Sequence, residues 1–229
     1  MSLKILLIIY FPVLAIELFA NLNGRAAPVQ FVSKPLLMLI LLAYFVSNSR
    51  KMASLLKYPI IFALAFSWLG DVLLLIDKHT KTFFVYGLTA FLVAHLCYIF
   101  YFLKIRRLNN PGKAPNALLF LPIAGYSLSL LGVIAPNVKH MILPVAIYAL
   151  VISVMLAASF SAFDLGKQNF GKISVAGTLL FIVSDSILAI SRFAAPFELA
   201  PLFVMTTYAL AQLLITEGSL RNLKEIEHG

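Results

Sequence analysis

Cysteine, histidine and charged residues are all scarce in this chain. One residue of 229 is a cysteine and four are histidines, so internal disulfides and cysteine-based metal clusters are excluded. With so few scattered histidines we expect no zinc site. Only 12% of the residues are charged, against about 25% in soluble domains. So little charge cannot keep a globule of this size dissolved, so a soluble fold is excluded.

What the chain has instead is long apolar runs. It is 62% hydrophobic with a mean hydropathy of +0.97. A membrane-crossing helix needs roughly 17–25 mostly apolar residues. By that rule we predict a single all-α membrane domain, residues 1–229, with eight transmembrane helices. The expected spans are 3–22, 31–48, 58–77, 82–104, 115–134, 141–162, 172–192 and 198–217.

The cationic residues lie mostly in the short breaks between these runs. Although the net charge is +9, this arrangement does not indicate nucleic-acid binding. Twelve of the 18 lysines and arginines fall on the side of the N-terminus and six on the other. Because short cytoplasmic loops collect cations, both termini are predicted to be cytoplasmic. We expect the inner membrane of a bacterium, and the sequence does not predict an oligomeric state.

A faint internal repeat relates the two halves of the chain. Residues 66–76 align with residues 180–190 at an offset of 114, which superposes the third span on the seventh. Apolar segments also align by chance, so a 4+4 parallel repeat about an axis near the membrane normal is one of two open interpretations. In either case both spans run in the same direction, so Asp71 and Asp185 are predicted to lie at similar depth.

Three of the nine acidic residues fall within predicted spans and away from their end residues, at Glu17, Asp71 and Asp185. An ionisable group in hydrocarbon costs several kcal/mol and usually faces a cavity or a partner. Glu17 lies near the interface, and we expect it to reach outward. Asp71 and Asp185 each follow a small residue, which lets a helix or ligand approach closely. They are either a hydrogen-bonded pair between helices or a carboxyl pair, one member protonated, that supplies an acid and a base.

Other polar residues have two interpretations each. Lys34, expected at the opening of the second span, either extends to the interface or pairs with a phosphate or a carboxylate. His95 lies near the middle of the fourth span and either bonds between helices or belongs to the site. Five further residues either complete a polar pocket or bond within their own helices: Ser67, Ser184, Ser186, Tyr208 and Gln212.

Phosphate loops, dinucleotide fingerprints and nucleophile elbows are absent from the sequence. Six short motifs are nevertheless familiar in their order and spacing. They are Ser33–Leu36, Trp68–Leu74, Phe91–Tyr98, Gly177–Ser186, Arg192–Phe193 and Tyr208–Gln212. Through these motifs the whole chain resembles the YhhN family of lysoplasmalogenase-like membrane proteins.

The resemblance implies an eight-helix hydrolase without a metal or cofactor. Its substrate would be a lysoplasmalogen, whose vinyl-ether bond is cleaved to a fatty aldehyde and glycerophosphoethanolamine or glycerophosphocholine. The family's two intramembrane aspartates, proposed as catalytic, correspond to Asp71 and Asp185. Lys34 and His95 match positions of the same polar site, and Tyr98, Ser184, Tyr208 and Gln212 are expected to bind substrate. Which aspartate is the acid and which the base stays open.

Two other functions are compatible with a buried carboxyl pair. A proton-coupled transporter of a lipid or small molecule would use the carboxylates to carry protons or to bind its substrate. A noncatalytic lipid-binding bundle would respond to mutation in affinity but would release no product.

Overall fold

The computed structural model describes residues 1–23, 27–52, 54–80, 83–109, 120–138 and 141–228. In these ranges the chain forms eight helices and no strand. The helices are α1 (Leu3–Leu22), α2 (Ala27–Ser49), α3 (Lys57–Thr80), α4 (Phe84–Asn109), α5 (Phe120–Val138), α6 (Ile142–Ala162), α7 (Asn169–Phe193) and α8 (Ala200–His228). All eight are long and apolar enough to cross a membrane, which confirms the predicted all-α membrane fold.

Helix boundaries differ from the predicted spans mainly in the second half of the chain. The first helix has the predicted bounds, whereas α8 continues to His228, well past the expected end at 217. Its last turns are polar, so hydropathy ends the span before the backbone ends the helix. Residues 115–119 of the fifth predicted span lie outside the described residues, and α5 continues through Pro136 to Val138.

Lys34 lies deeper in the second helix than the sequence predicts. Because α2 begins at Ala27, Lys34 and Pro35 lie about two turns inside it and not at its opening. The Lys34 side chain is only 13% exposed. The expectation that this residue opens the span was therefore wrong, and its ammonium lies among the helices.

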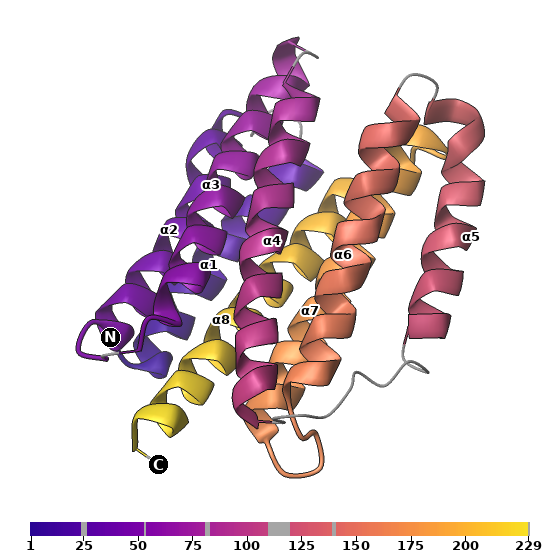
Figure 1. Ribbon diagram of the computed structural model, residues 1–229. Helices are drawn as coiled ribbons and strands as arrows, with labels where there is room; N and C mark the ends of the chain where they lie inside the picture. The colour runs from indigo at the N-terminus through magenta and orange to yellow at the C-terminus, as the bar shows by residue number, and fades with distance from the viewer. Residues whose placement is uncertain (24–26, 53, 81–82, 110–119, 139–140, 229) are drawn as a thin grey trace.

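The helices pack as a bundle in which consecutive helices lie side by side, except α4 and α5, which are separated by α6 (Figure 1). The pairs α3–α4 and α7–α8 make the most extensive contacts, and α4 also packs against α6. Helix α5 lies at the edge of the bundle against α6 and α7, and it is the least buried of the eight. Both termini lie toward the same end of the bundle (Figure 1).

Small residues bring the paired helices into close contact. A Cβ added at Gly177 of α7 would lie 2.8 Å from the backbone nitrogen of Ile215 in α8. A Cβ at Gly70 of α3 would lie 2.6 Å from the ring of Phe91 in α4. Helix association in lipid relies on such close packing, because lipid tails are as apolar as the helix surfaces. The small residue before Asp71 therefore admits the neighbouring helix.

Candidate active site

Both membrane-embedded aspartates line one cavity, which we call the carboxyl cavity. Asp71 enters it from α3 and Asp185 from α7, and Lys34 of α2 lies at its edge. Helices α4, α5, α6 and α8 supply the remaining described walls, and the cavity volume is about 90 Å³. The two carboxyls predicted to lie at similar depth thus face a common space.

Asp71 is almost completely buried and is held from two sides. The Lys34 Nζ lies 3.3 Å from Asp71 Oδ1. The Tyr208 hydroxyl of α8 donates a hydrogen bond of 2.9 Å to Asp71 Oδ2. A neighbouring cation and a donated hydrogen bond both favour the ionised carboxylate. Both contacts therefore hold the Asp71 carboxyl in a defined position at the wall of the cavity.

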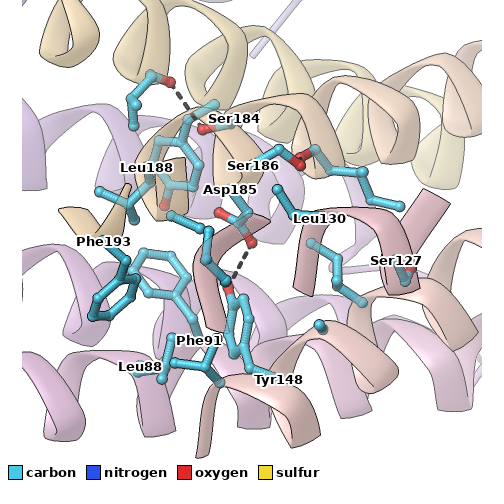
Figure 2. Close-up of a pocket in the computed structure, with 18 of the residues that line it drawn as sticks. Leu88, Phe91, Ser127, Leu130, Tyr148, Ser184, Asp185, Ser186, Leu188 and Phe193 are labelled. Atoms are coloured by element: carbon cyan, nitrogen blue, oxygen red, sulfur yellow. Dashed lines mark hydrogen bonds between the residues drawn. The ribbon is translucent and has the colours of Figure 1, made fainter. Parts of the chain in front are cut away.

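Asp185 has a different environment. Its Oδ2 accepts a hydrogen bond of 2.6 Å from the Tyr148 hydroxyl of α6, and Figure 2 shows this phenol pointing at the carboxyl. Within the described residues no lysine or arginine forms an ion pair with Asp185. Asp185 as a whole residue is half-buried. The two aspartates therefore differ in charge environment, although they face the same cavity.

Apolar side chains surround the carboxyl groups. Leu88 and Phe91 of α4, Leu130 of α5, and Leu188 and Phe193 of α7 form the walls in Figure 2. Few water molecules can solvate a charge in such a space, so the fixed groups act strongly on any charge that develops there. The same walls suit a hydrocarbon chain.

The serines of the cavity have their hydroxyls engaged locally. Ser184 donates to the backbone oxygen of Val204 at 3.0 Å, and Ser186 donates to that of Ile182 at 2.6 Å. Ser186 also accepts a hydrogen bond of 2.6 Å from the Tyr126 hydroxyl of α5. These contacts tie α7 to α8 and α5, while both serines line the cavity.

Three predicted site residues lie behind the cavity and not on its wall: His95, Tyr98 and Gln212. The Tyr98 hydroxyl donates to Gln212 Oε1 at 2.7 Å, and Gln212 Nε2 donates to Ser67 Oγ at 2.9 Å. His95 is fully buried with its ring edge-on to those of Tyr148 and Phe181. Of the candidate residues named from the sequence, the structure brings six together at the cavity: Lys34, Asp71, Ser184, Asp185, Ser186 and Tyr208.

A second space, which we call the polar chamber, adjoins the carboxyl cavity and shares Lys34 with it. Its charged lining residues are Glu17, Lys34, Asp77 and Arg192. Glu17 is 1% exposed and does not reach outward, so that expectation was wrong. It is held inside by Ser33, which donates to Oε2 at 2.5 Å, and by Asn21, which donates to Oε1 at 3.0 Å.

Sequence reasoning missed Tyr148 and Asp77, and it named Arg192 only as part of a family motif, without a role in the site. Asp77 and Arg192 lie at helix ends, where charges are unremarkable, yet Arg192 Nη2 lies 3.1 Å from Asp77 Oδ2. Tyr148 is one of many aromatic residues in the chain, and its type alone did not distinguish it from the others. One signal was present, because Tyr148 follows Lys34 by the same 114 residues that separate Asp71 from Asp185.

Known proteins resemble this chain over most of its length. Residues 29–219 match the model of the YhhN family. Human lysoplasmalogenase TMEM86B is 37% identical over 70% of this chain and 62% of its own length. The rat protein of that name is 33% identical over 82% of this chain and 71% of its own. The lysoplasmalogenase of Mycobacterium tuberculosis is 33% identical over 68% of this chain and 58% of its own.

The chain thus spans about three fifths of the human and mycobacterial proteins that it matches. All three relatives are named lysoplasmalogenases, and no transporter is among them. No solved structure matches the chain. The family match covers most of the sequence and agrees with the eight apolar helices. The chain is an integral membrane protein and belongs to the YhhN family.

Proposed function

We propose that this protein hydrolyses the vinyl-ether bond of lysoplasmalogens, releasing a fatty aldehyde and a glycerophospho-base. The observation that carries the proposal is the pair Asp71 and Asp185, which face one apolar-walled cavity from different helices. The names of the relatives support the choice of substrate. The hydrocarbon chain lies along the apolar walls, and the polar end of the lipid lies toward Lys34.

The chemistry requires a proton donor and a stabilised cation. Protonation of the β-carbon of the vinyl ether gives an oxocarbenium ion, and water then adds to the cationic carbon. The hemiacetal formed collapses to the aldehyde and the glycerol hydroxyl, and the proton taken from water restores the acid. Glycoside hydrolysis passes through a similar cation, and there two carboxyl groups divide the acid and base roles.

The neighbours of the two aspartates support a division of roles. Asp71, beside Lys34, is the ionised group that stabilises the oxocarbenium ion and orients water. Asp185 has no cation partner among the described residues and is the acid that protonates carbon. Tyr148 fixes the orientation of the Asp185 carboxyl by its hydrogen bond. Lys34, Ser184 and Tyr208 complete the substrate-contacting set.

The test is aldehyde release from lysoplasmenylethanolamine by protein purified in detergent. We expect release by the wild type and none by Asp71→Asn or Asp185→Asn, with all three proteins equally folded by size-exclusion chromatography. Glu217→Gln is the matched control, because Glu217 is a hydrogen-bonded carboxylate of α8 that lines neither space. Full activity in either aspartate variant contradicts the mechanism. If none of the proteins, including the wild type, releases aldehyde, the proposed function is wrong.

We also propose that the protein lies in a bacterial inner membrane with both termini in the cytoplasm. The excess of cationic residues on the side of the termini supports this orientation. The shared position of the two termini at one end of the bundle is compatible with it (Figure 1). Fusions of alkaline phosphatase and of green fluorescent protein to the C-terminus test it, since only the second is expected to be active.

A further inference from the structure

We propose that the polar chamber is a headgroup site that selects lipids with a primary ammonium group. In this site the phosphate lies against Lys34 and Arg192, and the ethanolamine ammonium lies against Glu17. The inference rests on the proposed function, because it takes the substrate to be a lysoplasmalogen. It adds a preference for ethanolamine over choline and over headgroups without an amine.

The polar chamber is placed to receive the polar end of a lipid held in the carboxyl cavity. The polar chamber and the carboxyl cavity share Lys34, so a ligand can extend from one into the other along this side chain. The polar chamber has the larger volume, about 160 Å³. In a lysoplasmalogen the glycerol backbone separates the vinyl ether from the phosphate. A lipid with its vinyl ether between the aspartates therefore places its phosphate near Lys34.

Two cationic side chains of the chamber are suited to bind the phosphate. Arg192 and Lys34 each contact one carboxylate, at 3.1 Å and 3.3 Å, and each has further N–H donors that these contacts do not occupy. The guanidinium of Arg192 is held against the ring of Phe84, with 4.6 Å from its central carbon to the ring centroid. A guanidinium fixed in this way is suited to bind phosphate oxygens in a defined orientation.

One carboxylate of the chamber, Glu17, is suited to bind the ammonium group. Glu17 is the carboxylate of the chamber that forms no ion pair within the described parts of the chain, yet it is 1% exposed. Its two oxygens each accept one hydrogen bond, from Ser33 and Asn21, and each can accept another. A buried carboxylate that faces a chamber is stabilised by a cation that donates hydrogen bonds, as a primary ammonium does.

The residues that line the chamber favour an ethanolamine headgroup over a choline headgroup. A trimethylammonium group cannot donate hydrogen bonds and is usually bound by the faces of several aromatic rings. Phe84 is the one aromatic side chain among the described residues that line the polar chamber, and Arg192 covers its face. The chamber therefore offers choline no aromatic cage, whereas Glu17 with its polar neighbours suits a primary amine.

The first experiment measures kcat/KM for lysoplasmenyl lipids with ethanolamine, choline or a phosphate monoester as headgroup. We expect the wild type to favour ethanolamine by about 10-fold, the worth of one charge-assisted hydrogen bond. Glu17→Gln keeps an acceptor for Ser33 and removes the charge. It is expected to abolish the preference mainly by raising KM for ethanolamine, whereas Glu217→Gln keeps the preference. Equal use of all three headgroups by the wild type overturns the proposal.

A second measurement separates this inference from the proposed function. Saturated alkyl-ether lysolipids with the same headgroups cannot be hydrolysed by this route, and their binding is followed as a shift in the thermal unfolding of the protein. An ethanolamine preference that Glu17→Gln removes supports the headgroup site even if no aldehyde is ever released. Hydrolysis without any headgroup preference in binding or turnover supports the function and overturns the site.

A substrate series keeps the test decisive if Glu17→Gln does not fold. Wild-type protein is assayed with ethanolamine, N,N-dimethylethanolamine and choline lipids, in which N–H donors are removed in turn. A stepwise fall in kcat/KM supports donation to a carboxylate, and a flat series overturns it. Arg192→Gln provides the complement, because it is expected to raise KM equally for every headgroup that carries a phosphate.

Discussion

Tyr98 of α4 and Gln212 of α8 share a hydrogen bond of 2.7 Å across the buried centre of the bundle, although they are 114 residues apart. This separation is the offset that relates Asp71 to Asp185. In a duplicated bundle, two equivalent residues that touch each other lie at the symmetry axis. The contact therefore supports the 4+4 parallel repeat and indicates where its axis runs.

Most of the helix contacts follow the same correspondence, although those of α1 with α8, α3 with α8 and α5 with α7 have no counterpart of comparable extent among the described residues. The pairs α1–α2, α2–α3 and α3–α4 have counterparts in α5–α6, α6–α7 and α7–α8, and the contact of α2 with α8 has its counterpart in α6 with α4. Lys34 and Tyr148 are equivalent under the same offset, and each contacts the corresponding aspartate. One half thus carries an ammonium where the other carries a phenol, which gives the two carboxyls unlike environments.

Replacement of Lys34 by methionine is expected to destabilise the protein and to abolish aldehyde release. It leaves Asp71 buried without its cation, and removing one partner of a buried pair costs about 3–5 kcal/mol. The double variant Lys34→Met with Asp71→Asn removes both charges, so it should regain stability without regaining activity. Thermal unfolding in detergent checks the first claim. A single variant as stable as the wild type contradicts it.

Tyr148→Phe and Tyr208→Phe each remove one hydroxyl that donates to one of the two proposed catalytic carboxyls. A hydrogen bond to a charged group contributes about 1.5–3 kcal/mol, so loss of the Tyr208 hydroxyl beside ionised Asp71 should lower activity by about 10–100-fold. A hydrogen bond between neutral groups contributes about 0.5–1.5 kcal/mol, so loss of the Tyr148 hydroxyl beside protonated Asp185 should lower activity by about 2–10-fold. We expect the loss in kcat more than in KM, because these phenols orient carboxyls. Steady-state kinetics measure the split. Tyr126→Phe, which removes a donor to Ser186 on the same cavity wall, is the control and should change kcat little.

Tyr98→Phe is expected to lower stability and to leave the kinetics unchanged. The hydroxyl bonds to Gln212, and neither residue lines the carboxyl cavity. Interhelical hydrogen bonds in membranes contribute about 0.6–2 kcal/mol, so a modest drop in the unfolding midpoint should follow. An increase in KM would instead assign Tyr98 to substrate binding, as the sequence alone had suggested.

Gly177→Ala is expected to destabilise the contact between α7 and α8. The new Cβ would lie 2.8 Å from one backbone atom of α8 and 2.9 Å from another, so a helix has to move. Overpacking of this kind costs about 1–3 kcal/mol. Gly125→Ala in α5 is the matched control, because nothing lies within 4 Å of its added Cβ. It should leave the unfolding temperature unchanged or raise it, and equal losses in both variants contradict the prediction.

Much of the fold follows from hydropathy alone. Lipid acts on each segment separately, so eight runs of sufficient length predict eight helices without any knowledge of their packing. Asp71 and Asp185 were recognisable for the same reason, because a carboxyl group inside an apolar run is costly wherever the helix lies. Their similar depth was predictable because both spans run in the same direction, whether or not the two halves are duplicated.

The partners of these carboxyls were decided only by tertiary structure. Tyr208 bonds to Asp71 across 137 residues, and whether two such side chains meet depends on the rotation and register of separate helices. Glu17 appeared close enough to the interface to face water, but the rotation of α1 turns it inward toward Ser33. Local sequence determines which segments enter the membrane, because lipid contacts each residue directly. Packing between distant segments determines which polar groups meet there, because only that contact satisfies them.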